Sequence, residues 1–107
     1  MMRFEFRDLE FDDELAKYAD LGIWSRIGFL DEFVSVTVCF TLEAGRDGAQ
    51  TRCRMEAGPL PRANVAVNVV AEGVDADPYK AADRAAERLA TIINRLIEAR
   101  LIQQGAA

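Results

Sequence analysis

The chain has 107 residues, half of them apolar, and a formal net charge of −5. This length suits one folded domain, residues 1–107, with a real core, and is too short for two. The sequence contains no histidine, which removes the commonest general base and the commonest zinc ligand, and no glycine-rich phosphate loop. These features argue against an enzyme, and we expect neither a metal nor a cofactor.

The N-terminal sequence MMRFEFRDLEF alternates charged and apolar residues, which is unlike a signal peptide. No apolar run approaches the roughly 20 residues that a membrane-spanning helix needs. We therefore expect a cytoplasmic protein with no membrane partner. The charge is uneven, because residues 1–43 hold ten acids and four bases, whereas residues 44–107 hold eight acids and nine bases. The second half is thus the half suited to face an anion.

A strand and a helix are expected first. Residues 2–7 alternate apolar and charged side chains, the pattern of a half-buried strand. A helix follows, with Asp12 or Asp13 as its N-cap and with Gly22 and Gly28 setting its end. Its expected apolar stripe consists of Leu15, Tyr18, Ala19, Ile23 and Ile27.

Three more strands are expected over residues 33–43, 50–57 and 64–72. The segment EAGRDGAQ predicts a hairpin turn between the first two, and GPLPR ends the second. The buried sides are expected to carry Val34, Val36, Val38, Phe40 and Leu42, then Thr51, Cys53, Met55 and Ala57, then Val65, Val67, Val69 and Ala71. Cys39 then lies on the polar side of its strand and Cys53 on the apolar side of the next. Two such side chains cannot be bridged, so we predict no disulfide.

A long helix is expected over residues 77–103, started by Asp77 as N-cap and by Pro78 at the first helical position. Its expected buried stripe consists of Ala82, Ala85, Ala86, Leu89, Ile92, Ile93 and Leu96, in which the alanines allow close approach to the sheet. The fold class is therefore α+β, in the order β-α-β-β-β-α. A four-stranded sheet carries both helices on one face and exposes the other.

Three segments of this chain resemble the ribosome hibernation-promoting factor family, also called ribosome-associated inhibitor A or sigma-54 modulation proteins. They are LAKYA in the first helix, FVSVTVCFTLEAGR in the second strand, and VAEGVDADPYKAADRAAERL leading into the second helix. The likeness covers nearly the whole chain, as a short form of the family. It implies a non-enzymatic stress protein that binds ribosomal RNA of the small ribosomal subunit and inhibits translation.

The resemblance implies that RNA is contacted by lysine and arginine on the two helices. The candidate contacts here are Lys80, Arg84, Arg88 and Arg95 of the second helix, with Lys17 and Arg26 of the first. Of these, Arg88 and Arg95 stand where the family has basic residues, whereas Thr91 and Asn94 stand where such residues often occur. The chain departs from the family in the first helix, where Gly22 and Ser25 stand at positions that commonly hold lysine. Lys80, Arg84, Arg88 and Arg95 form a basic row along the second helix. The alternative interpretation of this row is a solvated helix face whose charges pair locally.

The open face of the sheet offers a second basic group, Arg3, Arg7, Arg52 and Arg54. These side chains could hold phosphate, but cross-strand ion pairs are the simpler explanation. The second helix, about 40 Å long, should extend beyond strands of about 26 Å. Its end, with Ile97, Leu101 and Ile102, either meets a second copy or packs on the same chain. The alternative function is a homodimeric interaction module without RNA binding, whose acidic first helix (Asp12, Asp13, Glu14, Asp20) faces a basic partner.

Overall fold

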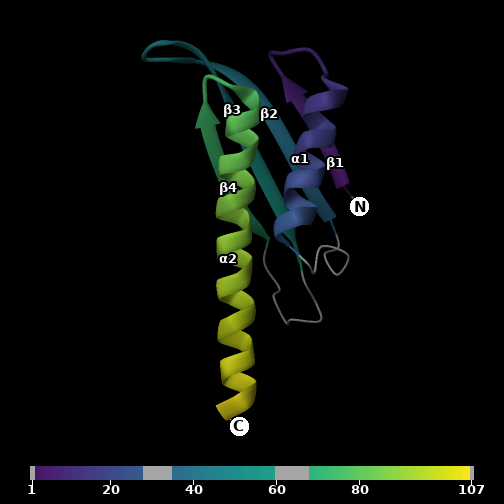
Figure 1. Cartoon of the computed structure of the whole chain (residues 1–107), viewed down its shortest axis with the longest axis vertical. Coiled ribbons are helices and arrows are strands. Elements are labelled where there is room, and N and C mark those ends of the chain that lie inside the picture. Colours follow the sequence, from purple (N-terminus) through teal and green to yellow (C-terminus); the bar gives the residue numbers. More distant parts are fainter. Residues whose placement is uncertain (1, 28–34, 60–67, 107) are drawn as a thin grey trace.

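The computed structural model describes residues 2–27, 35–59 and 68–106, with side chains as far as Ala99 (Figure 1). The order of elements is β-α-β-β-β-α, as the sequence predicts. The elements are β1 (Met2–Arg7), α1 (Asp13–Arg26), β2 (Ser35–Gly45), β3 (Gly48–Gly58), β4 (Val69–Asp75) and α2 (Pro78–Ala106).

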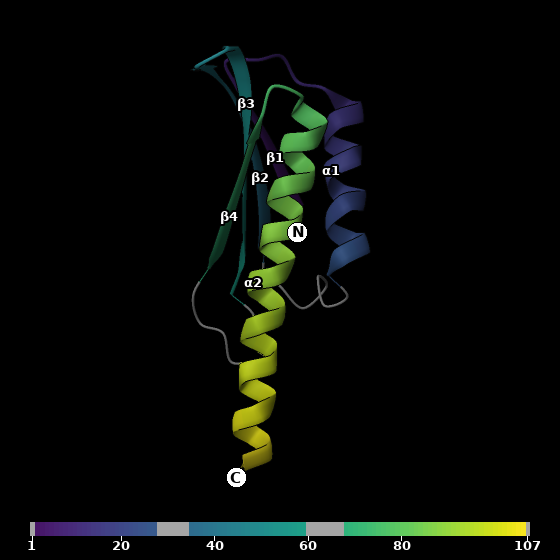
Figure 2. The ribbon, with the colours of Figure 1, turned by 60° about the vertical axis from the view of Figure 1, so that its left-hand side comes forward.

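The four strands form one mixed sheet in the order β1-β2-β3-β4. β1 runs parallel to β2, and the other two pairs are antiparallel. Both helices lie on the same side of this sheet (Figure 2). The predicted fold class, α+β with two helices on one face, is therefore confirmed.

The core lies between the sheet and the helices, and α2 comes very close to β4. Ala81, Ala82, Ala85 and Ala86 of α2 are almost completely buried. A Cβ atom added to Gly73 of β4 would lie only 2.6 Å from the backbone nitrogen of Ala85. Small side chains on both elements thus permit this approach, as predicted for the alanines.

Asp12 is the N-cap of α1, and its Oδ1 accepts a hydrogen bond from the amide of Leu15 at 3.2 Å. The predicted end was only partly right, because α1 continues through Gly22 and ends at Arg26, with Ile27 as C-cap. Tyr18 was wrongly assigned to the buried stripe. It is 39% exposed, and its ring packs against the edge of another ring rather than in the core.

Three more side chains assigned to the core are partly exposed: Ile92 (37%), Leu96 (38%) and Leu42 (40%). On α2, Ala81 and Ala90, which the predicted stripe left out, are buried in their place. β4 ends at Asp75 rather than Glu72, and the predicted positions 64–67 lie outside the described residues. The same holds for Gly28 and for residues 33–34 of the expected second strand.

Both cysteines are free thiols, as predicted. The register pairs Cys53 with Phe40 and pairs Arg54 with Cys39, so the two thiols lie on opposite faces of the sheet. Burial raises the pKa of the Cys53 thiol to about 12. Cys39, on the helix-free face, is nevertheless only 9% exposed, so its position on the polar side of the strand does not make it accessible.

Candidate nucleic-acid interface

Four basic residues lie on one exposed side of α2: Lys80, Arg84, Arg88 and Arg95. Successive residues in a helix are about 100° apart, so these four positions fall within about 80° of one another around the helix axis. The structure therefore brings together the four bases that the sequence predicts for this helix. Glu87 and Glu98 lie on the same side, so the row is interrupted by acids.

The two middle bases of the row reach toward β4. Arg84 Nη2 lies 3.0 Å from Asp75 Oδ2, at the end of the strand. Arg88 Nη1 donates a hydrogen bond of 2.7 Å to the backbone carbonyl of Glu72. Among the strands that the structure describes, β4 lies at the edge of the sheet, so its outer backbone groups have no strand partner there, and Arg88 satisfies one of them.

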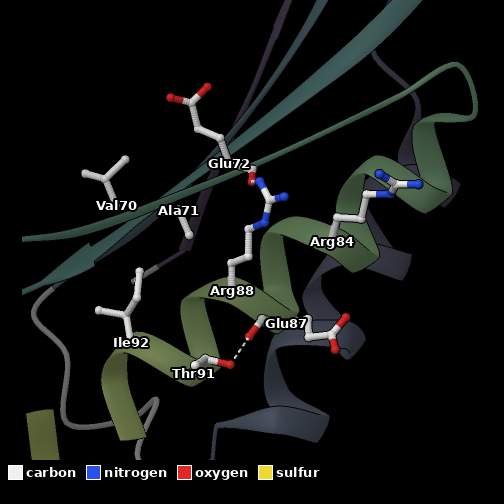
Figure 3. A pocket seen from close by; sticks show the side chains of 8 residues that line it. All are labelled: Val70, Ala71, Glu72, Arg84, Glu87, Arg88, Thr91 and Ile92. Carbon is white, nitrogen blue, oxygen red and sulfur yellow. Dashed lines mark hydrogen bonds between the residues drawn. The ribbon is translucent and has the colours of Figure 1, made fainter. Parts of the chain in front are cut away.

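These side chains border an open groove of about 710 Å³ between β4 and α2 (Figure 3). The groove is lined by Val70, Ala71, Glu72, Arg84, Glu87, Arg88, Thr91 and Ile92. Figure 3 shows the guanidinium of Arg88 extending from α2 to the Glu72 backbone. Thr91 donates its hydroxyl to the Glu87 carbonyl at 3.0 Å, so it is held on the helix. The groove is charged around Glu72, Arg84 and Arg88, whereas Val70 and Ile92 make its other end apolar.

Lys80 and Arg95 differ from the two middle bases. Among the residues that the structure describes, no carboxylate lies within 4.0 Å of either charged group. Both residues are exposed. Within the row, these two residues can meet an external anion without first giving up an ion pair, as Arg84 would, or a backbone hydrogen bond, as Arg88 would.

The two predicted bases of α1 are separated from each other. Lys17 and Arg26 are nine residues apart, which is two and a half turns, so they lie on opposite sides of the helix. Arg26 Nη2 lies 3.8 Å from Asp83 Oδ1 of α2. Lys17 is paired with Asp13 at 2.9 Å on the outward side. Only Arg26 thus reaches α2, and it does so on the side that faces α1, whereas Arg84 and Arg88 reach toward β4.

Asp83 joins the two helices. The Tyr18 hydroxyl donates to its carboxylate, with distances of 3.0 Å to Oδ1 and 2.9 Å to Oδ2. This hydrogen bond raises the pKa of Tyr18, with smaller contributions from burial and from the negative charge. Tyr18 also meets Tyr79 edge to face, with ring centroids 5.0 Å apart. The cluster fixes α1 beside the first turns of α2.

The bases on the open face of the sheet are paired with acids. Arg52 bridges two neighbouring strands, with Glu43 and Glu72 each at 2.9 Å. These bonds raise the pKa of Arg52 and lower that of Glu43. The remaining bases pair within their own strands, Arg3 and Arg7 with Glu5 and Arg54 with Glu56. Ion pairing therefore accounts for these arginines, but the predicted cross-strand pairing holds only for Arg52.

Sequence reasoning missed the two acids that hold the bases of the second half, Glu72 and Asp75. The Glu72 contact depends on the register of β4 against β3, in which Glu72 is opposite Arg54 and thus diagonal to Arg52, whereas the Asp75 contact depends on the packing of α2 against β4. The sequence holds no local signal for this diagonal contact. In the described chain, no group of three acids or cysteines is arranged to hold a metal ion, and neither helix could cross a membrane.

No protein-family model and no curated protein sequence matches this chain. Several solved structures are similar, among them the following two. The N-terminal domain of Thermus thermophilus Protein Y shares 29% identity over 87% of this chain and 93% of that one, with a TM-score of 0.68. A ribosomal subunit interface protein from Coxiella burnetii shares the fold, with a TM-score of 0.70 at 14% identity, over 89% of this chain and 96% of that one. The likeness to the Protein Y domain confirms the resemblance of this chain to the ribosome hibernation-promoting factor family, and the Coxiella structure confirms the fold.

Proposed function

We propose that this protein is a ribosome-associated factor, not an enzyme, that binds the small ribosomal subunit in the cytoplasm and inhibits translation there. The observation that carries the proposal is the 29% identity to the Protein Y domain across almost the whole fold. The name of the Coxiella structure, a ribosomal subunit interface protein, points to the same partner.

The proposed contact surface is the basic side of α2, formed by Lys80, Arg84, Arg88 and Arg95, with Arg26 of α1 as an additional contact. Lysine and arginine, with polar side chains such as Thr91, are the usual partners of backbone phosphates. Lys17 lies on the other side of α1 and would contribute a separate contact.

The ion pairs on this surface do not prevent phosphate binding. Arg84 has a side chain that is 56% exposed, and its pair with Asp75 can exchange with another anion. Exposed ion pairs stabilise proteins by only about 0.2–1 kcal/mol. A phosphate can therefore compete with the Asp75 carboxylate for Arg84, but Asp75, whose side chain is only 20% exposed, stays nearby and adds to the local repulsion from Glu87 and Glu98 that weakens binding.

The test is co-sedimentation with purified small subunits at about 0.1 M salt, using Arg84→Gln combined with Arg88→Gln. Two phosphate contacts are removed, and each contributes about 0.9 to the slope of log affinity against log salt on a duplex. We therefore expect a loss of about tenfold to 100-fold in affinity. Circular dichroism checks that the variant remains folded.

The matched control is Arg3→Gln combined with Arg7→Gln. These arginines are also exposed and ion-paired, and the change in net charge is the same, but they lie on the opposite face. The control should bind as the unchanged protein does. Equal losses in both variants would contradict a specific contact through α2 and would leave only an effect of total charge.

A second candidate is a homodimeric interaction module that does not bind RNA. It is favoured by the C-terminal part of α2, which extends well past the strands (Figure 1). Ile97 is half-buried against the core, and the side chains of Leu101 and Ile102 lie outside the described residues. Light scattering that gives twice the mass of the chain, without sedimentation at low salt, would favour this candidate.

A further inference from the structure

Helix α1 has apolar side chains on two sides. One side is in the core, where Leu15, Ala19 and Ile23 are at most 1% exposed. The other side carries Leu21, which is 69% exposed, and Trp24, which is 45% exposed. A single exposed apolar residue is ordinary, but a leucine and a tryptophan one turn apart are neighbours on the helix surface and together make an apolar patch.

The outward position of this patch follows from helical geometry. Lys17, Leu21 and Trp24 are spaced four and three residues apart, so they share one face. Lys17 itself is 74% exposed by its side chain, which marks this face as the solvent side of α1. The chain as the structure describes it leaves this face uncovered.

Acidic residues surround the apolar patch. Asp13, Glu14 and Asp20 lie on the same outward half of α1. Lys17, the basic residue of this face, is already paired with Asp13 at 2.9 Å, and Arg26 is turned toward α2. Within the described residues, neither Glu14 nor Asp20 has a cation at ion-pair distance. The face is therefore apolar at its centre and negative at its border.

We propose that this face, formed by Leu21, Trp24, Glu14 and Asp20, docks a lysine- and arginine-rich protein segment that carries an apolar side chain. The apolar side chain packs on Leu21, the bases meet the two carboxylates, and an arginine can stack on the Trp24 ring. RNA is repelled by this charge. A second copy would bring the same acids together, because a two-fold interface pairs a patch with itself.

This assignment goes beyond the proposed function, since it gives α1 a protein partner while α2 faces RNA. Trp24 is the only tryptophan of the chain, so it reports directly on this face. The probe is a short synthetic peptide with two leucines among lysines and arginines, and its control has glutamate in place of each base. The basic peptide should shift the emission of Trp24 to shorter wavelengths and lower its acrylamide quenching constant at least twofold. The acidic peptide should do neither.

Two variants separate this face from general charge attraction. Leu21→Ser should weaken the basic peptide at least fivefold, whereas Leu42→Ser, an exposed leucine on β2, should leave its affinity unchanged. Equal affinity of both variants would overturn the proposal. So would the same change in emission with the acidic peptide, with polyuridylate, or on concentrating the protein alone. No ribosome enters this assay, so its failure is distinct from a failure of subunit binding.

Discussion

Gly73 is the position where α2 and β4 come closest, and replacing it by alanine tests how the groove is built. An added Cβ would lie 2.6 Å from the Ala85 backbone nitrogen and 2.7 Å from the Arg84 Cβ, and it would also meet the Ala81 carbonyl oxygen. These atoms belong to the helix backbone or are fixed to it, so a rotamer change cannot relieve the contact. The whole of α2 must move outward.

Overpacking of this kind costs about 1–3 kcal/mol of folding free energy, and a clash with backbone belongs in the upper half of that range. We expect Gly73→Ala to lower the free energy of unfolding by about 2–3 kcal/mol. With a urea dependence of roughly 1–3 kcal/mol per molar, the unfolding midpoint falls by about 1 M or more. Urea titration followed by circular dichroism measures this shift.

Gly22→Ala is the matched control, because it makes the same chemical change inside a helix. There the added Cβ would meet only Arg26 Nη1, at 3.3 Å, and this is the end of a flexible side chain. Alanine is favoured over glycine within a helix by about 0.5–1 kcal/mol, so this variant should be more stable. A Gly73→Ala variant within 0.5 kcal/mol of the unchanged protein would refute the close packing of α2 on β4.

Three further predictions follow from single side chains. Cys53, fully buried with its thiol pKa raised to about 12, should react with a disulfide reagent at pH 8 only as fast as the protein unfolds, measured in a Cys39→Ser background. Rapid labelling of the folded state would contradict this burial. Arg52 lowers the pKa of Glu43, so this carboxylate stabilises the fold above its ordinary pKa of 4.5 and loses that effect as pH falls through the lowered value. Glu43→Gln should therefore show a smaller acid-induced loss of stability in urea titrations, and an unchanged pH profile would exclude this effect. Asp77→Ala removes an acceptor 2.9 Å from an amide at the start of α2, and it should lower the thermal midpoint by about 4–8 °C, equivalent to about 1 kcal/mol; an unchanged midpoint would show that the cap is unimportant.

Local patterns were sufficient to predict the architecture. Strict alternation in residues 2–7 and the Asp77-Pro78 start of the last helix are short-range features, and both appear where expected. Errors arose where burial depends on a neighbouring element. Leu42 lies on the same side of its strand as the core residues, yet it is 40% exposed, because it is close to the turn of the long β2–β3 hairpin. Tyr18 has helical spacing with the core, yet its hydroxyl bonds to Asp83 of the other helix.

The candidate site was predictable as a row but not as a surface. Helical periodicity alone aligns Lys80, Arg84, Arg88 and Arg95. It does not reveal that Arg84 meets Asp75 or that Arg88 reaches the β4 backbone, because both contacts need the packing of α2 on the sheet edge. Sequence reasoning therefore identified the charges but not their partners.

The most direct test of the account is the salt dependence of binding to purified small ribosomal subunits. If the four bases of α2 each neutralise a phosphate, the slope of log affinity against log salt should be about −3 to −4. Binding should then fall about 100-fold between 50 and 200 mM salt. A slope near zero, or no binding at 50 mM salt, would contradict the central claim that α2 recognises ribosomal RNA.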